Sequence, residues 1–433
     1  MSYHERMVGV LKKITEEEFI KSVLLKDSAF SRDPHMTFEE MLKFMLQDKK
    51  KSLSNELINY YTEIDKIEKT ITKQAYSEQR QHISYEAFTL LNEEFVKDYY
   101  KKEDYRTFQG YVVVGIDGST LEIPNVKKLK SAFGSAKASQ TSASLARAGV
   151  NGFYDCLNNI MLLSKIDSYQ KGEKEVLTAN LDHLIELMEG KKLLLVFDRG
   201  YICTELLLLL KEKDVKYLFR CPKNVFKQER NKSQTNDEMI DIKVTKSRTN
   251  AFKLLEKELY INTTISVRLV NILLDTGEVE YLITNLGFEE VSYEQMGDLY
   301  ISRWKIEKSF DVLKNKLQIE NIGARTENGV KQEFYACVLL YNFLEDIRNQ
   351  MDQDIENNKG NKHEYKVNMN VLVGTLKENL TMIINDPNDI DNKIDALYQQ
   401  IKRNLVAIRP DRKNPRVKKV SRNKHKPNIR RSF

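Results

Sequence analysis

The sequence contains few of the residues that break or cross-link a polypeptide. Its 433 residues include 7 Pro, 17 Gly, 4 Cys and 1 Trp, and 41% are hydrophobic. This composition excludes disordered and collagen-like chains, because such chains are rich in Pro or Gly and cannot form a core. The cysteines are widely spaced without a C-x-x-C pair, so we expect reduced core thiols rather than a zinc knuckle or a disulfide framework. They are Cys156, Cys203, Cys221 and Cys337.

Long hydrophobic runs are also missing. The longest, such as 193–197 and 206–210, are far too short to cross a bilayer. The first residues, MSYHERMVGVLKK, contain no hydrophobic stretch of the kind found in signal peptides. We therefore expect a cytoplasmic protein without a membrane partner.

Charge is distributed unevenly along the chain. The net charge is +6, yet residues 401–433 contain 13 Lys or Arg and one acid, Asp411, so the remainder is net acidic. A basic tail of this density suits electrostatic attachment to nucleic acid, and it is equally typical of a disordered, solubilising chain end. The two interpretations do not exclude each other. An acidic remainder also means that any further DNA affinity must come from local patches.

The length predicts two or three domains, and the hydrophobic pattern divides the chain further. Residues before 109 look helical throughout, with Thr37 expected to cap a helix and Glu40 to complete a capping box. The expected segments are a helical N-terminal domain (1–108), the first part of an α/β core (109–222), a β-rich insertion (223–290), the second part of the core (291–350), a C-terminal helical region (351–404) and a basic tail (405–433).

The first part of the core is predicted to contain three strands, a helix, a strand, a helix and a strand, in that order. Asn151-Gly152 is expected to form the hairpin turn between the second and third strands. The apolar run LLLVF is typical of a strand buried on both faces in the central sheet of an α/β fold. The expected strands are 111–117, about 144–154, 158–166, 192–198 and 216–221, and the expected helices are 173–189 and 203–213.

Two acidic residues stand where strands of this sheet should end. Asp117 follows the run YVVVGI, and Asp198 follows KKLLLVF. The carboxyl ends of strands in an open α/β sheet border the crevice in which ligands bind. Each Asp taken alone is more typical of a turn or a helix N-cap, because each closely precedes a Gly. Two such acids together favour a functional site.

A predicted helix at 298–317 carries a third acid and two cations along one side. At about 100° per residue, four polar side chains fall within a sector of roughly 60°. Taken alone, a mixed-charge helix face is more often a solvated surface with i,i+4 pairs. The four polar residues are Tyr300, Arg303, Glu307 and Lys314, beside an apolar sector of Ile306, Phe310, Leu313 and Leu317.

The three acids and their surroundings resemble a known family. The four polar residues of the helix spell Y-x2-R-x3-E-x6-K, Asp117 lies in D-G-S, and Asp198 lies in D-R-G-Y. This pattern resembles the DDE transposases of bacterial insertion sequences that carry the Y-R-E-K signature. The four-residue signature at fixed spacing is specific for this family, whereas D-G-S and D-R-G-Y alone are weak indications of it. The resemblance extends from about residue 30 to about residue 350.

The resemblance implies an α/β protein with a ribonuclease-H-like catalytic core, a mostly β insertion and an all-α N-terminal DNA-binding domain. The implied activity is cut-and-paste DNA transposition, with strand nicking at the element's ends, a hairpin intermediate and transfer of 3′-hydroxyls into target DNA. The implied partners are double-stranded DNA, namely the terminal inverted repeats and the target, and a second subunit in a homodimer. The implied location is bacterial and nucleoid-associated.

The resemblance also assigns roles within the site. Asp117, Asp198 and Glu307 become the catalytic residues and the ligands of two Mg²⁺ or Mn²⁺ ions. Three converging carboxylates repel one another unless a cation neutralises them, and oxygen ligands without paired His or Cys favour these metals over zinc. Tyr300 and Lys314 are expected to hold DNA phosphates, together with the bidentate fork of the arginine between them, Arg303.

The segment 52–84 resembles the helix-turn-helix-like part of the family's N-terminal region. Its side chains Lys73 and Arg80 are expected to contact DNA, and an ordinary helical bundle surface accounts for them equally well. For a flipped base, no residue stands out. Trp304 is expected to pack against the core, and Tyr281 is a weak stacking candidate more typical of strand packing.

Two other classes of function remain. A metal-dependent nuclease or a decayed transposase would keep the three acids and lose pairing of specific DNA ends. A non-enzymatic DNA-binding repressor would need only residues 1–108 and the basic tail. The intact acids and signature argue against the repressor.

Removal of residues 405–433 tests the basic tail. We expect the truncated protein to bind DNA more weakly and with a flatter dependence on salt, because fewer phosphates are neutralised. DNA binding measured over a series of salt concentrations gives both quantities. Unchanged affinity and slope would show that the tail takes no part in binding.

Overall fold

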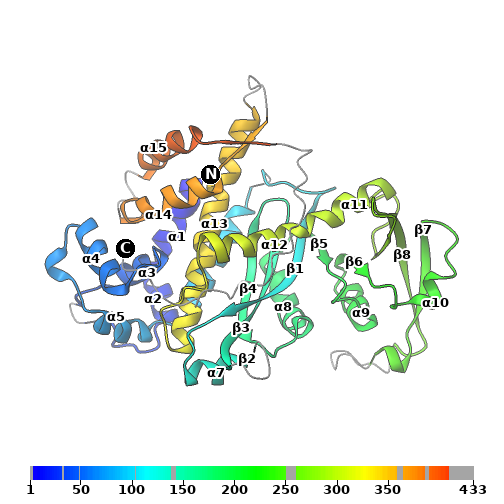
Figure 1. The fold of residues 1–433 in the computed structure, drawn as a ribbon, viewed down its shortest axis with the longest axis horizontal. Coiled ribbons are helices and arrows are strands. Elements are labelled where there is room, and N and C mark those ends of the chain that lie inside the picture. Colours follow the sequence, from blue (N-terminus) through cyan, green and yellow to red (C-terminus); the bar gives the residue numbers. More distant parts are fainter. Residues whose placement is uncertain are drawn as a thin grey trace.

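A computed structural model provides the structure of the chain, and its coordinates describe most residues. Helices of the N- and C-terminal parts gather at one end, and a long sheet extends away from them (Figure 1). The basic tail predicted from residue 405 lies outside the described residues from 409 onward. The described ranges are 3–31, 34–47, 49–102, 104–137, 143–249, 260–357, 364–385 and 390–408.

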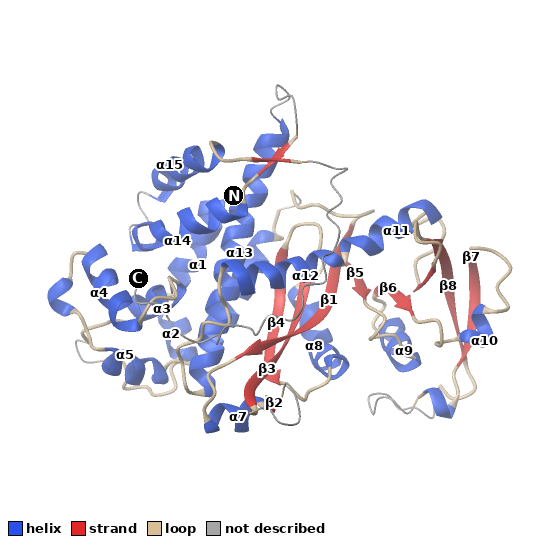
Figure 2. Cartoon of the chain, in the orientation of Figure 1, coloured by secondary structure: helices blue, strands red, loops and turns tan. Residues whose placement is uncertain are grey.

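One mixed sheet runs from the middle of the protein to the end opposite the N-terminal helices (Figure 2). Within the described ranges it has nine strands in the order β2-β3-β1-β5-β6-β9-β8-β7, with β4 paired to β3. The strands are β1 (Tyr111–Glu122), β2 (Ser135–Ala136), β3 (Leu145–Asp155), β4 (Ile160–Ser168), β5 (Lys192–Phe197), β6 (Lys216–Cys221), β7 (Asp237–Lys243), β8 (Thr264–Leu273) and β9 (Val279–Thr284).

The central strand is β1. It pairs antiparallel with β3 on one side and parallel with β5 on the other, and β6 continues parallel to β5. The residues of β5 from Leu193 to Phe197 are all buried, as expected for a strand covered on both faces. Six of the seven predicted elements of this part begin and end within about two residues of the prediction; the exception, β1, continues five residues beyond it.

The β-rich segment that follows joins the same sheet. β9 pairs antiparallel with β6, β8 with β9, and β7 with β8. A turn at 275–277 joins β8 to β9, with Gly277 at φ 78°, a conformation that favours glycine. The segment therefore extends the central sheet along its edge, away from the helical end of the molecule (Figure 1).

Helices cover the sheet and build the helical end. The capping box predicted at Thr37 and Glu40 is confirmed at the start of α3. The helices are α1 (Tyr3–Lys13), α2 (Glu17–Val23), α3 (Phe38–Leu46), α4 (Leu53–Glu63), α5 (Lys73–Gln79), α6 (Glu86–Tyr99), α7 (Lys127–Phe133), α8 (Glu173–Leu187), α9 (Thr204–Glu212), α10 (Lys227–Arg230), α11 (Tyr293–Ser302), α12 (Trp304–Asp311), α13 (Glu327–Asn357), α14 (Met369–Asn385) and α15 (Ile390–Lys402).

The long helix α13 joins the helical end to the sheet. It packs on β4 and on α6 and α3. A short two-stranded sheet, β10 (Tyr365–Lys366) with β11 (Val406–Ala407), closes the C-terminal part. All four cysteines are free, and three of them are buried. Among the described helices, none is long and apolar enough to span a membrane.

Two buried arginines fasten the N-terminal helices to α13. The Arg6 guanidinium pairs with Asp346, and both side chains are at most 5% exposed. Arg80 donates to the carboxylate of Glu333, to Gln332 Oε1 and to the carbonyl of Gly329. Because these groups are withdrawn from water, losing one partner leaves an uncompensated buried charge.

The predicted hairpin turn at Asn151-Gly152 is wrong. Both residues lie inside β3, where Gly152 pairs with Asp117 of β1, and the chain turns at 156–159 instead. Asn159, at φ 61°, supplies the left-handed residue of that turn. The glycine at position 152 instead allows a helix to pack closely above β3.

Substitution of Arg80 by alanine tests the contact with α13. We expect the free energy of unfolding to fall by about 3 kcal/mol, since the buried Glu333 carboxylate would lose the positive charge of Arg80. Chemical denaturation measures the change. Lys73→Ala, an exposed change at the start of the preceding helix α5, is the control and should shift stability by less than about 0.5 kcal/mol. Equal stability of the two variants would contradict a fastening role for Arg80.

Candidate active site

The register of β1 and β5 brings the first two acids together. Ile116 pairs with Phe197 in the parallel ladder, so Asp117 of β1 lies beside Asp198, the first residue after β5. Adjacent strands lie about 4.8 Å apart, and side chains at equivalent positions point to the same face. Two acids that are 81 residues apart in sequence therefore share one face of the sheet.

Two glycines let a helix approach that face closely. Gly115 lies two residues before Asp117, and Gly152 is the partner of Asp117 on β3. A Cβ on Gly115 would lie 3.7 Å from the carbonyl oxygen of Arg303 and 2.8 Å from Cys156 Sγ. A Cβ on Gly152 would lie 3.3 Å from the Phe310 ring. α12 therefore packs directly on the backbone around Asp117.

The signature segment is not the single helix that was predicted. α11 ends at Ser302, α12 begins at Trp304, and a π-helical turn follows at Val312–Lys316. Arg303 keeps helical angles (φ −53°, ψ −34°) at the junction, so the axis continues with little interruption. The wider π turn changes the angular position of Lys314, because its spacing differs from 3.6 residues per turn. The predicted apolar sector is confirmed as buried.

Arg303 lies between two of the acids. Its Nη2 donates to Glu307 Oε1 at 2.8 Å, and its Nη1 is 3.6 Å from Asp117 Oδ2. The Arg303 side chain is 3% exposed, whereas the Glu307 side chain is 40% exposed. The Nε of Arg303 is buried and has no hydrogen-bond partner among the described residues. One buried guanidinium thus supplies the positive charge between two carboxylates.

The other two signature residues also contact the segments that carry the acids. The Tyr300 hydroxyl lies 3.5 Å from Asp198 Oδ1, a long hydrogen bond. Lys314 Nζ donates to Ser119 Oγ at 2.7 Å and to the carbonyl of Thr120 at 2.9 Å. All four signature residues therefore converge on the D-G-S and D-R-G-Y segments, which the spacing in sequence could only suggest.

A fourth acid, Glu173, lies at the site without having been predicted. It begins α8, and its carboxylate rests over Gly118, where a Cβ would lie 2.2 Å from Glu173 Oε1. Tyr201 of the D-R-G-Y segment is 1% exposed and faces this group; burial, Glu173, Asp117 and Asp198 together raise the pKa of its phenol. No motif in the sequence marks Glu173, since it lies at an ordinary helix start.

The two aromatic residues considered for a flipped base, Trp304 and Tyr281, have different surroundings. Trp304 was expected in the core, but it is 40% exposed, and the Arg303 guanidinium carbon lies 5.1 Å from its ring centre. Its position at the junction of α11 and α12 turns it away from the core. Tyr281 on β9 is half-buried, and the guanidinium of Arg230 covers its ring at 4.1 Å, so that face is occupied.

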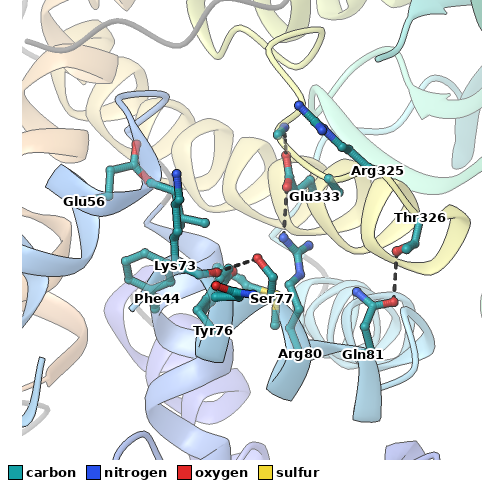
Figure 3. Close-up of a pocket in the computed structure, with 15 residues that line it drawn as sticks. Phe44, Glu56, Lys73, Tyr76, Ser77, Arg80, Gln81, Arg325, Thr326 and Glu333 are labelled. Atoms are coloured by element: carbon teal, nitrogen blue, oxygen red, sulfur yellow. Dashed lines mark hydrogen bonds and ion pairs between the residues drawn. The ribbon is translucent and has the colours of Figure 1, made fainter. Parts of the chain in front are cut away.

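The expected N-terminal DNA contacts have different surroundings. Lys73 is exposed at the start of α5, at the edge of a cavity of about 540 Å³ bounded by α3, α5 and the loop before α13 (Figure 3). Arg80 was expected to contact DNA as well, but its guanidinium is turned into the protein toward Glu333. As placed, Arg80 is not free to reach a phosphate, because burial and three hydrogen-bond partners hold it.

The environment of Asp117 is electrostatically unusual. Burial raises its pKa from 3.8 to about 6, the charge of Arg303 and the Gly118 N–H oppose the rise, and Glu173 and Glu307 add to it. Burial likewise raises the pKa of Glu173, with a contribution from Asp198. Burial is therefore the main cause of both raised pKa values, and the neighbouring carboxylates add to it around a single guanidinium.

The donor atoms at this site suit a hard divalent cation. The carboxylates of Asp117, Asp198 and Glu307 all lie near the Arg303 guanidinium, and carboxylate oxygens are the ligands that Mg²⁺ and Mn²⁺ prefer. In the described part of the chain, however, no three His, Cys, Asp or Glu side chains are already grouped closely enough to hold a metal. The oxygen ligands suit a hard divalent cation, but the guanidinium of Arg303 lies between two of them, those of Asp117 and Glu307.

A family comparison agrees with this geometry. The model of the transposase DDE domain matches residues 108–343, which include every acid and signature residue described above. The chain therefore belongs to the family of transposases with a DDE domain.

Two individual proteins resemble parts or the whole of the chain. A Synechocystis protein assigned as the transposase of insertion sequence element IS4SA is 34% identical over 68 residues, covering 14% of this chain and 20% of that protein. The piggyBac transposase, solved in a synaptic complex with hairpin DNA, is 10% identical with a TM-score of 0.48, over 92% of this chain and 84% of that one. These likenesses are too short or too distant to transfer an activity.

The elevated pKa of Asp117 predicts a dependence of stability on pH. Between 3.8 and about 6 the folded chain holds a proton that the unfolded chain releases, so stability falls as pH rises through this window. Asp117→Asn should therefore be more stable than the natural protein at pH 7.5, by about 1–2 kcal/mol after solvent screening, and equally stable near pH 4.

Urea denaturation at both pH values measures the difference. Asp311→Asn, which neutralises an exposed acid of the neighbouring helix α12, should leave stability nearly unchanged at either pH. A destabilised Asp117→Asn variant at pH 7.5 would contradict the electrostatic description.

Proposed function

We propose that this protein is a DNA transposase that cuts the ends of an insertion sequence and joins them to target DNA by phosphoryl transfer. The observation that carries the proposal is the convergence of Asp117, Asp198 and Glu307 with the signature residues on one face of the sheet. Membership of the DDE family supports the same activity.

We also propose a ribonuclease-H-like catalytic core. Its support is the spatial order β4-β3-β1-β5-β6, in which three antiparallel strands precede two strands parallel to β1. In this arrangement the acids come from the central strand, from the end of its parallel neighbour and from a helix packed above them. The remaining strands, β7 to β9, form the insertion between the second and third acids.

Asp117, Asp198 and Glu307 are proposed as ligands of two Mg²⁺ or Mn²⁺ ions. When bound there, such a pair supplies activation of a water or 3′-hydroxyl and stabilisation of the leaving oxygen. The protein's own task is to hold the three carboxylates on rigid elements. Gly115 and Gly152 serve this task, because they allow α12 to set Glu307 against β1.

The cations and aromatic groups around the acids are proposed to hold the DNA strand. Arg303 offers a planar fork that suits a phosphate, and Lys314 keeps the D-G-S-T segment in place as well as adding charge. The exposed Trp304 ring beside Arg303 offers a surface on which an unpaired base can stack. Tyr300 orients Asp198 through its hydroxyl.

The resemblance of the signature extends the proposal to partners and intermediates. It supports a hairpin on the element's end and a homodimer that bridges two ends. In the helical end, Lys73 remains a proposed DNA contact because it is exposed, together with the basic tail. Arg80 is not proposed for this role.

The test is cleavage of DNA that carries the ends flanking the reading frame, with Mg²⁺ or Mn²⁺ present. Asp117→Asn, Asp198→Asn and Glu307→Gln should each lower cutting by at least about 1,000-fold, because each removes a charged donor at the centre of the reaction. Binding to the same DNA, measured by gel shift, should change little.

The matched control is Asp311→Asn, which removes an exposed acid from the same helix as Glu307. It should cut at close to the natural rate. Cutting by Asp117→Asn at the natural rate would overturn the assignment of the site, and loss of cutting in the control would show that α12 tolerates no change of charge.

A further inference from the structure

The position of Arg303 conflicts with immediate metal binding at the three acids. Its guanidinium contacts Glu307 Oε1 at 2.8 Å and lies 3.6 Å from Asp117 Oδ2, so it occupies the space between two proposed ligands. Among the described residues no acidic group is preassembled for a metal. A guanidinium and a divalent cation cannot share this space, because like charges at such distances repel strongly in a partly buried site.

The burial of Arg303 shows that it serves the acids in this state rather than a ligand outside. The residue is 2% exposed, and its contacts are with Glu307, Asp117 and the rings of Tyr300 and Trp304. Without a cation, Asp117 and Glu307 would face each other on closely packed elements with uncompensated charge. Arg303 removes part of that cost.

Two features of its surroundings allow the Arg303 guanidinium to leave the acids. Its Nε is buried without a hydrogen-bond partner in the described structure, so the guanidinium is bound at only one of its two edges. Its carbon lies 5.1 Å from the centre of the Trp304 ring, and Trp304 is 40% exposed, so the guanidinium borders a ring that reaches the surface. A DNA phosphate at that position can accept two hydrogen bonds from the Arg303 guanidinium. The Glu307 carboxylate accepts a hydrogen bond from only one of the guanidinium nitrogens.

We propose that Arg303 is an internal counter-cation that keeps the acids closed to divalent metal until a DNA phosphate draws its guanidinium away. This inference rests on the proposed function and adds its regulation. Metal and DNA then favour each other: DNA removes the group that blocks the metal, and the metal removes the carboxylates that retain the arginine. Such coupling is reciprocal, so each ligand must tighten the other by the same factor.

The experiment measures Mn²⁺ binding by electron paramagnetic resonance of the free ion, with full-length protein and no DNA. Arg303→Gln should bind Mn²⁺ about tenfold more tightly than the natural protein, a factor typical of coupled sites. Arg303→Lys should fall between the two, because an ammonium keeps the charge and cannot bridge two carboxylates. A residue that merely held phosphate would leave the metal affinity of the DNA-free protein unchanged.

The control for a simple change of charge is Lys308→Gln. Lys308 is exposed on the same helix, so its loss alters the net charge equally without opening the space between the acids. Its Mn²⁺ affinity should rise by less than about twofold. Circular dichroism and thermal unfolding establish whether each variant is folded. If Arg303→Gln does not fold, the Mn²⁺ affinity of Arg303→Lys decides the test.

The second half of the experiment adds a DNA duplex carrying the element's end. In the natural protein, DNA should tighten Mn²⁺ binding about tenfold, and Mn²⁺ should tighten DNA binding by the same factor. In Arg303→Gln both factors should approach one. Mn²⁺ affinity of Arg303→Gln equal to or weaker than that of the natural protein, without DNA, would overturn the proposal.

Asp117→Asn separates this inference from the proposed function. If that variant binds Mn²⁺ as tightly as the natural protein, the acids do not hold the metal and the proposed function itself fails. If Asp117→Asn loses the metal while Arg303→Gln shows no gain, the acids hold the metal and only the counter-cation role of Arg303 is wrong.

Discussion

The close approach of α12 to the central strand is the constraint on which the rest of the structure depends. Gly115 and Gly152 lie on the same face of the sheet as Asp117, and neither has a side chain that would keep the helix away. Ile306 and Phe310 fill the space above them. Because the helix is fixed at this distance, its polar residues reach the acids of the sheet rather than solvent.

That packing concentrates negative charge, and the electrostatics of the site follow from it. Burial and neighbouring carboxylates raise the pKa of Asp117, and the buried guanidinium of Arg303 offsets only part of the effect. The site is therefore prepared for more positive charge than the protein itself supplies. In the proposed function a divalent cation would supply that charge, and a DNA phosphate would compete with the acids for the Arg303 guanidinium.

Local signals in the sequence predicted most strands and helices but misjudged features that depend on packing. Asn151-Gly152 is a good turn signal, yet the contact of α12 with β3 requires a glycine there. Arg80 lies in a segment suited to DNA contact, yet Glu333, 253 residues away, holds it inside. Glu173 belongs to no motif and became visible only where the start of α8 meets Gly118.

The sequence by itself determined the three acids, the spacing of the signature and the family they resemble, because these properties depend on residue types at fixed separations. It also predicted β1 and β5 as buried strands, with β5 ending just before Asp198, whereas β1 continues five residues beyond Asp117 to Glu122. Only the tertiary structure decided which cation lies among the acids. Distances between side chains on different elements arise from packing, and packing placed Arg303 between Asp117 and Glu307, which no pattern along the chain specifies.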